Sequence, residues 1–160
     1  MAEQQARARL SEPPALLATW FGSGFVRLAP GSFASLTALP GAALLVWLGG
    51  PALVLGAAAA LFALGIWASD AYMAVVKVHD PPAIVIDEVV GQWITLALLP
   101  LDPLIYALGF LLFRIIDVVK PWPTNFIDRA VTGGFGVMLD DVVAGVYAGG
   151  ALWLMVAWWP

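Results

Sequence analysis

The stretch that decides the fold is LAPGSFASLTALPGAALLVWLGGPALVLGAAAALFALGIWAS, residues 28–69, which contains no charged residue. A helix of about 20 apolar residues crosses a bilayer core of ~30 Å, so this stretch has room for two such helices. The sequence Gly49-Gly50-Pro51 at its middle is a turn signal. We therefore predict one span over 33–48 and a second, longer span over 52–76.

Further apolar segments continue this pattern toward the C-terminus. Segments 84–99 and 104–119 are joined by a Pro100–Pro103 turn, and a last span covers 141–158. A helix of 16 residues is about 24 Å long, so the middle two segments either span the membrane or form a re-entrant hairpin. Residues 15–32 predict a short helix and a surface loop, and residues 120–139, rich in Pro and Gly, predict another loop.

Composition supports a membrane protein built as one domain. Hydrophobic residues make up 62% of the 160 residues and charged residues 11%, against about 25% in ordinary soluble domains. We expect an all-α, polytopic integral membrane bundle of four to five membrane-embedded helices. A polar tail over 1–14 would precede a single membrane-embedded catalytic domain over 15–160. Seven basic residues cannot form a surface that follows a phosphate backbone, which excludes a nucleic-acid partner.

The distribution of Lys and Arg predicts the orientation in the membrane. Cytoplasmic loops carry an excess of these residues, and a cytoplasmic N-terminus collects nearly all of them on one side. The turns at 49–51 and 100–103 and the end at 158–160 then face the opposite side without any Lys or Arg. Most acids follow the basic residues, and only Asp102 is placed outside. The residues assigned to the inner side are Arg7, Arg9, Arg27, Lys77, Lys120 and Arg129.

Two pairs of adjacent acids lie at the predicted ends of spans. Asp87 and Glu88 occur in VHDPPAIVIDEVVG (78–91), and Asp140 and Asp141 in DRAVTGGFGVMLDDVVAGVYAGG (128–150). Both pairs are predicted to open a helix, where acids also serve as caps and interact favourably with the helix dipole. Carboxylates beside hydrocarbon are costly, which favours a functional role. His79, just before the first pair, is either structural or a direct participant.

Cations and a glycine-serine loop lie on the same predicted side. In FRIIDVVKPWP (113–123), Arg114 and Asp117 share a helical face, and Lys120 follows at the helix end. The arginine and aspartate either neutralise each other or contribute to a phosphate site with Lys120, because Arg binds phosphate as a fork and Lys as a point charge. Gly31 and Ser32, in GSGFVRLAPGSFASL (22–36), offer backbone N–H groups and a hydroxyl to an anion.

Together these groups predict metal-assisted phosphoryl chemistry at one membrane face. An all-oxygen donor set favours Mg²⁺ or Mn²⁺ over zinc. The absence of cysteine excludes a cysteine phosphatase, and a single histidine excludes the usual histidine-nucleophile lipid phosphatase. An Asp-x-Asp nucleophile motif is also missing, since Asp140 and Asp141 are adjacent.

The chain resembles the phosphatidylglycerophosphatase A family in the order and spacing of four strings: GSGFVRLAPGSFASLTALP (22–40), VHDPPAIVIDEVVGQWITLALLP (78–100), FRIIDVVKPWP (113–123) and DRAVTGGFGVMLDDVVAGVYAGG (128–150). The resemblance covers most of residues 20–150. It implies a bacterial cytoplasmic (inner) membrane enzyme of phospholipid biosynthesis. Such an enzyme removes the terminal phosphate of the phospholipid phosphatidylglycerophosphate, gives phosphatidylglycerol and depends on Mg²⁺.

Under this resemblance the site residues fall into two groups. The acids would hold Mg²⁺ and orient the attacking water, with the base or nucleophile among them left open: Asp87, Glu88, Asp117, Asp140 and Asp141. The phosphate would be bound by Arg114, Lys120, Gly31, Ser32 and His79. Two other hypotheses explain the same acids: a divalent-cation or proton-coupled transporter, and a non-catalytic membrane subunit in which the acids form caps and salt bridges.

Overall fold

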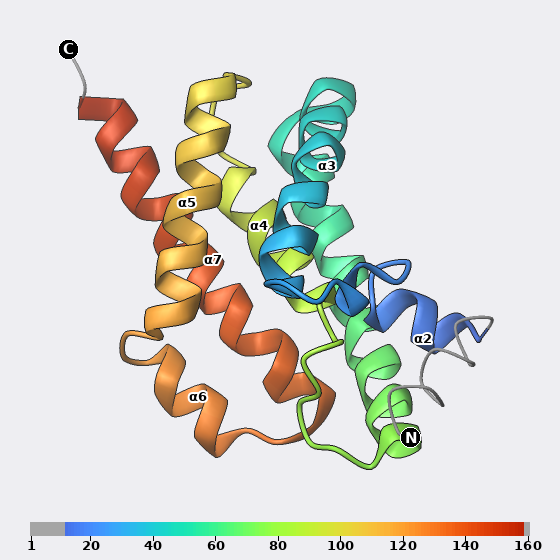
Figure 1. The fold of residues 1–160 in the computed structure, drawn as a ribbon. Coiled ribbons are helices and arrows are strands. Elements are labelled where there is room, and N and C mark those ends of the chain that lie inside the picture. Colours follow the sequence, from blue (N-terminus) through green and yellow to red (C-terminus); the bar gives the residue numbers. More distant parts are fainter. Residues whose placement is uncertain (1–11, 159–160) are drawn as a thin grey trace.

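The computed structural model describes residues 12–158, and every element in that range is a helix (Figure 1). Most of the predicted polar tail, with Arg7 and Arg9, lies outside the described residues. The elements in chain order are α2 (Pro13–Ala18), η1 (Ser23–Phe25), α3 (Pro30–Val76), α4 (Ile86–Leu96), α5 (Pro103–Val119), α6 (Thr124–Ala130) and α7 (Gly133–Trp158).

Helix α3 consists of two legs that meet at Gly50. The backbone of Gly50 is non-helical, with φ 65° and ψ −161°, and Pro51 begins the second leg. Only glycine adopts such a conformation without strain. Figure 1 shows the chain reversing direction here, and Leu61 of the second leg packs against a core cluster that includes Ala34 and Ala38 of the first. The turn predicted at Gly49–Pro51 is therefore present.

Helices α4 and α5 occupy the two predicted middle segments. At 11 residues α4 is about 16 Å long, too short to cross a bilayer core alone. The connection over residues 97–102 continues from the end of α4 to the side of the bundle where α3 turns (Figure 1). There Asp102 caps α5, because its Oδ1 accepts hydrogen bonds from the N–H groups of Leu104 and Ile105 at 2.8 and 3.0 Å.

The loop predicted over 120–139 is wrong, because it contains α6 and the first two turns of α7. The glycines read as flexible are positions of close approach: a Cβ on Gly134 would lie 2.3 Å from the Ile66 carbonyl oxygen. The Gly134 N–H donates to Asp70 Oδ1 at 2.6 Å, which satisfies one free donor at the helix start. Asp140 and Asp141 consequently lie in the third turn of α7 and do not cap it.

Helix α4 packs between α3 and α7 at the centre of the bundle. Its contact with α7 depends on small residues, since a Cβ on Gly145 would lie 2.4 Å from the Gly91 carbonyl oxygen. Trp93 on another side of α4 donates its indole N–H to the Ala38 carbonyl of α3 at 3.0 Å. The start of α4, which carries Asp87 and Glu88, is thus fixed by helices on both sides.

Two of the described helices, α3 and α7, are long and apolar enough to cross a membrane. Only 28% of the most apolar window of each is buried, which is unlike the core helix of a soluble protein. Large apolar side chains instead lie exposed along the bundle, including Trp47, Trp67 and Trp153. These features suggest membrane association. The number of four to five embedded helices stays a prediction.

Candidate active site

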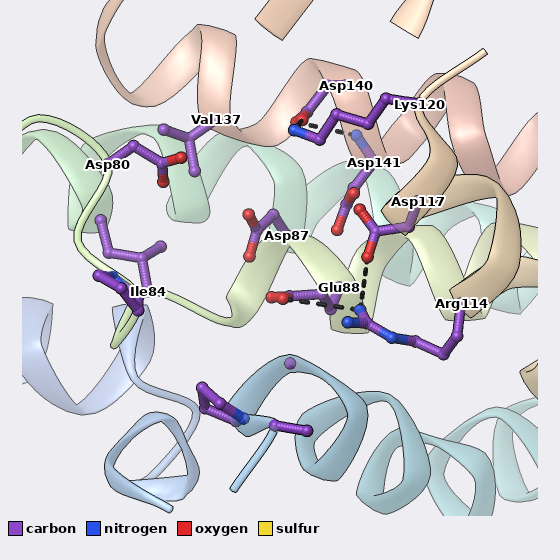
Figure 2. A pocket seen from close by; sticks show the side chains of 14 residues that line it. Asp80, Ile84, Asp87, Glu88, Arg114, Asp117, Lys120, Val137, Asp140 and Asp141 are labelled. Carbon is purple, nitrogen blue, oxygen red and sulfur yellow. Dashed lines mark hydrogen bonds and ion pairs between the residues drawn. The ribbon is translucent and has the colours of Figure 1, made fainter. Parts of the chain in front are cut away.

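A cavity of about 290 Å³ lies where four helix segments meet (Figure 2). The start of α3, the start of α4, the end of α5 and the third turn of α7 surround it, and the 80–84 loop closes one side. Segments far apart in the sequence therefore supply one site. Its lining contains Ala29, Pro30, Gly31, Asp80, Pro82, Ile84, Asp87, Glu88, Arg114, Asp117, Lys120, Val137, Asp140 and Asp141.

Three of the carboxylates form a compact group at the centre of the cavity. Asp87, Glu88 and Asp141 each offer one oxygen, and these oxygens lie within 4.8 Å of one another. Each of the three residues also has one carboxylate oxygen that is buried without a hydrogen-bond partner: Asp87 Oδ1, Glu88 Oε2 and Asp141 Oδ2. Buried carboxylates this close repel one another, and each unpaired oxygen carries a desolvation cost. The arrangement is therefore poor for stability and well suited to binding a cation.

The other two predicted acids are held by fixed cations. Arg114 Nη1 lies 2.6 Å from Asp117 Oδ2, and the same nitrogen lies 3.7 Å from Glu88 Oε1. Lys120 Nζ lies 2.6 Å from Asp140 Oδ2 (Figure 2). Charge-assisted pairs at this distance are strong. Asp117 and Asp140 thus have close cation partners, Glu88 has a longer contact with Arg114, and Asp87 and Asp141 have no ion pair among the described residues.

Lys120 has a second partner on α6, because its Nζ lies 2.5 Å from Asp128 Oδ1. Burial lowers the pKa of Lys120, but the hydrogen bonds to Asp128 and Asp140 outweigh it and raise the pKa above its usual value. The ammonium therefore stays charged. It ties α6 to the side of the cavity formed by α7.

Gly31, in the first turn of α3, lines the cavity directly beside Glu88. A Cβ at this position would lie 1.9 Å from Glu88 Oε1 and 3.2 Å from Arg114 Nη1. Only glycine leaves room for the Glu88 carboxylate where it stands. The Ser35 hydroxyl donates to the Gly31 carbonyl at 2.9 Å, one turn along the helix.

Most of the predicted site residues meet in this cavity, and two do not. Ser32 and His79 are not among its lining residues, and His79 is exposed. Asp80, beside His79, lines the cavity and was not selected from the sequence. Asp128 was missed as well, because the loop prediction gave no reason to bring α6 toward Lys120.

Three lining residues adopt left-handed backbone conformations that favour glycine. The φ angles are 50° for Ala29, 47° for Asp80 and 47° for Lys120. Such a conformation costs a non-glycine residue roughly 1–2 kcal/mol. Strained residues of this kind cluster at functional sites, where the surrounding structure holds them in place. No sequence signal marks these positions.

The charges of the cavity determine what it can bind. Six carboxylates and two cations line it, an excess of four negative charges when all are ionised. Such a cavity repels a phosphate unless cations enter with it. With all-oxygen donors it matches the ligand preference of Mg²⁺, which prefers one or two carboxylates together with phosphate oxygens and waters.

Comparison with known proteins gives a single family. The sequence profile described as "Phosphatidylglycerophosphatase A" matches residues 16–156. The chain is 40% identical to the Phosphatidylglycerophosphatase A of Escherichia coli (strain K12) over 98% of this chain and 91% of that protein. It is also 40% identical to the Haemophilus influenzae protein of the same name, over 87% and 86% of the two chains.

A third relative carries a different name. A Bacteroides thetaiotaomicron protein, provisionally named as a phosphatidylinositol-3-phosphatase, is 40% identical over 84% of this chain and 88% of its own. No solved structure is significantly similar to the chain.

Proposed function

Since the chain belongs to the phosphatidylglycerophosphatase A family, we propose that it hydrolyses the terminal phosphate monoester of phosphatidylglycerophosphate and releases phosphatidylglycerol. The family makes the chain an enzyme, a phosphoric monoester hydrolase. The Mg²⁺ dependence, the roles of individual residues and the position at the cytoplasmic face are further parts of this proposal. The product would enter phospholipid biosynthesis.

The observation that carries the proposal is the excess negative charge of the cavity. A phosphate monoester brings up to two more negative charges into a space lined by six carboxylates and two cations. Electrostatic repulsion would prevent this in the absence of added cations. The site is thus suited to bind a metal ion by itself, and to bind phosphate only together with a metal ion.

Asp87, Glu88 and Asp141 are the residues we expect to hold Mg²⁺. Their oxygens lie close enough to share one ion, and their unpartnered atoms need a positive charge. When bound, the ion would supply Lewis-acid stabilisation of phosphoryl oxygens and would lower the pKa of a bound water. Asp117 and Asp140 complete the acidic lining and stay oriented by Arg114 and Lys120.

Arg114 and Lys120 are the two cations that face the cavity, and we assign them to the phosphate. Arg114 already spans Asp117 and Glu88, so its guanidinium has a fixed position beside the acids. A fixed donor does not reorganise as charge develops on the phosphoryl oxygens, which is the main source of electrostatic catalysis. Gly31 leaves room for the Glu88 carboxylate beside Arg114 and so helps to keep both groups in place.

The arrangement of the helices supports a cavity that opens at one membrane face. The α3 turn, the α4–α5 connection and the end of α7 lie together on one side of the bundle, and the helix ends around the cavity lie toward the other (Figure 1). With the positive-inside rule this favours the cytoplasmic face of a bacterial inner membrane, a multi-pass chain and a cytoplasmic N-terminus. Lipid would then reach the cavity from the side.

The experiment that tests the proposal is phosphate release from phosphatidylglycerophosphate by the purified protein in detergent, with Mg²⁺ and with EDTA. We expect release that requires Mg²⁺. Asp87→Asn and Asp141→Asn should each reduce kcat by at least about 100-fold, since each removes a charged metal ligand. Asp102→Asn is the matched control, because Asp102 caps α5 outside the cavity.

Three results would each contradict part of the proposal. Hydrolysis that is equally fast in EDTA would show that the reaction needs no metal ion and would refute the proposed metal site. Magnesium flux into liposomes without lipid turnover would instead favour the transporter hypothesis. Equal activity of Asp102→Asn and Asp141→Asn would show that the acids serve stability and not turnover.

A further inference from the structure

A second cavity adjoins the acidic one and differs from it in chemistry. It has a volume of about 410 Å³ and lies between η1, the last turns of α3 and the 78–83 loop. Pro30 and Pro82 line both cavities, so the two share a wall. This wall is stiff, because a proline ring fixes its own φ angle.

The lining of the second cavity is mostly apolar and contains one cation. Phe25, Tyr72 and Val76 contribute to its walls, and Arg27 is the only charged residue among the described residues that line it. Arg27 is exposed and makes no ion pair with any residue in the described range 12–158. The cavity thus offers a single guanidinium beside an apolar surface.

The substrate of the proposed reaction has a matching second charge. Phosphatidylglycerophosphate carries a terminal monoester and, across a three-carbon glycerol bridge, a phosphodiester with one negative charge. Beyond the diester lies the apolar diacylglycerol. With the monoester among the acids, the next groups must lie in an adjoining space.

We propose that the second cavity binds the phosphodiester and adjoining glycerol backbone of the lipid, with Arg27 as the specificity-determining contact to the diester. This inference rests on the proposed function. Arg fits a phosphate better than Lys because its planar fork donates two parallel hydrogen bonds. One guanidinium balances the single diester charge, and Phe25 and Val76 cover the start of the acyl chains.

This assignment separates binding from chemistry. Arg27 does not line the acidic cavity, so it contacts no reacting atom. It would strengthen binding of the ground state and the transition state equally, which lowers KM and leaves kcat unchanged. It would also favour a lipid with two phosphates over phosphatidic acid, whose single phosphate lies directly on diacylglycerol.

The test compares Arg27→Gln with Arg129→Gln on dihexanoyl phosphatidylglycerophosphate in a detergent without other phospholipid. Arg129 is the matched control, because it is an exposed arginine outside both cavities. We expect R27Q to raise KM about tenfold, or about 1.4 kcal/mol, with kcat within about twofold. R129Q should change neither. Because no other phospholipid is present, an effect under these conditions reports the diester of the substrate itself.

Product inhibition gives a second readout, and its first part needs only the wild-type protein. Dihexanoyl phosphatidylglycerol keeps the diester and lacks the terminal phosphate, whereas inorganic phosphate would bind among the acids. The lipid and inorganic phosphate should bind to the wild-type protein at the same time. R27Q should weaken inhibition by the lipid about tenfold and leave inhibition by phosphate unchanged. Mutually exclusive inhibition, equal KM for R27Q and R129Q, or a fall in kcat at constant KM would each overturn the inference. Absence of hydrolysis by the wild-type protein would refute the proposed function instead.

Discussion

Gly31 offers the sharpest test of the site, because the smallest possible side chain reaches the proposed metal ligand. In Gly31→Ala the added Cβ would lie 1.9 Å from Glu88 Oε1, whereas ordinary contact begins at 3.4 Å, so that oxygen must retreat by about 1.5 Å. The α3 backbone holds the new methyl group in place. The flexible end of Glu88 therefore moves, and Arg114 Nη1, at 3.2 Å from the methyl, is disturbed with it.

The magnitude follows from the geometry that Mg²⁺ requires. Its ligand distances are about 2.0–2.1 Å in near-ideal octahedral geometry, so a carboxylate displaced by more than 1 Å no longer binds in the same way. Misplacing a group by about 1 Å costs on the order of 100-fold in rate. We expect kcat to fall about 100-fold. Thermal stability should not fall with it, because replacing Gly by Ala within a helix gains roughly 0.5–1 kcal/mol.

The assay is Mg²⁺-dependent phosphate release, with the Mg²⁺ concentration varied and the unfolding midpoint measured on the same samples. Gly56→Ala is the matched control, because a Cβ at Gly56 of the same helix meets nothing within 4 Å. Gly56→Ala should retain wild-type activity. If kcat of Gly31→Ala falls by less than about threefold at every Mg²⁺ concentration, the contact between Gly31 and Glu88 does not matter for activity and the reasoning is refuted.

Three further predictions concern the stability of the fold. Magnesium should raise the unfolding midpoint of the wild-type protein and EDTA should reverse this, because binding to the folded state alone stabilises it; no shift at millimolar Mg²⁺ would argue against the site. Lys120→Met should destabilise the folded protein by about 2–3 kcal/mol, since it leaves the carboxylate of Asp140 buried and unpaired. Asp128→Asn should destabilise it by less than about 1 kcal/mol, since the Lys120–Asp128 pair is more exposed. Gly145→Ala should destabilise the folded protein by about 1–3 kcal/mol, because its Cβ would collide with the α4 backbone. Gly150→Ala should not, because a Cβ at Gly150 meets nothing within 4 Å. Equal melting curves for the two variants would refute the close α4–α7 packing.

The helical legs and the common location of the acids could be predicted from the sequence. The turn at Gly49–Pro51 is a local signal, and the structure has it at Gly50. The first turn of α4 contains Asp87 and Glu88 as expected, because a charged pair next to an apolar run marks a helix start. These features depend on neighbouring residues, which a single sequence displays.

The start of α7 could not be predicted in the same way. Three glycines within four residues, 133–136, indicate a flexible loop when only the local sequence is considered. In the structure they lie against Ile66 and Val131, and Asp70 accepts the Gly134 N–H from 64 positions away. A cap supplied from that distance has no local signature. The error in turn placed Asp140 and Asp141 at a helix end and hid α6 with Asp128.

The division of the five acids explains why a purely structural role is a weak interpretation. Helix capping would account for Asp87 and Glu88 in the first turn of α4, but Asp141 lies in the third turn of α7, where no free N–H needs a carboxylate. Salt bridging would account for Asp117 and Asp140, which have cations at 2.6 Å. Neither explains why Asp141 lies beside Asp87 and Glu88, with one buried and unpartnered oxygen in each residue.

A fold selected for stability alone would replace these three acids with apolar residues, since buried carboxylate oxygens without hydrogen-bond partners are costly. The same residues are what a divalent cation needs: oxygen donors close together, already desolvated and held by three packed helices. Preorganisation of this kind lowers the stability of the folded protein, and binding of the ion and the phosphate offsets this loss. The close group of Asp87, Glu88 and Asp141 is therefore the feature of the fold that is best explained by catalysis.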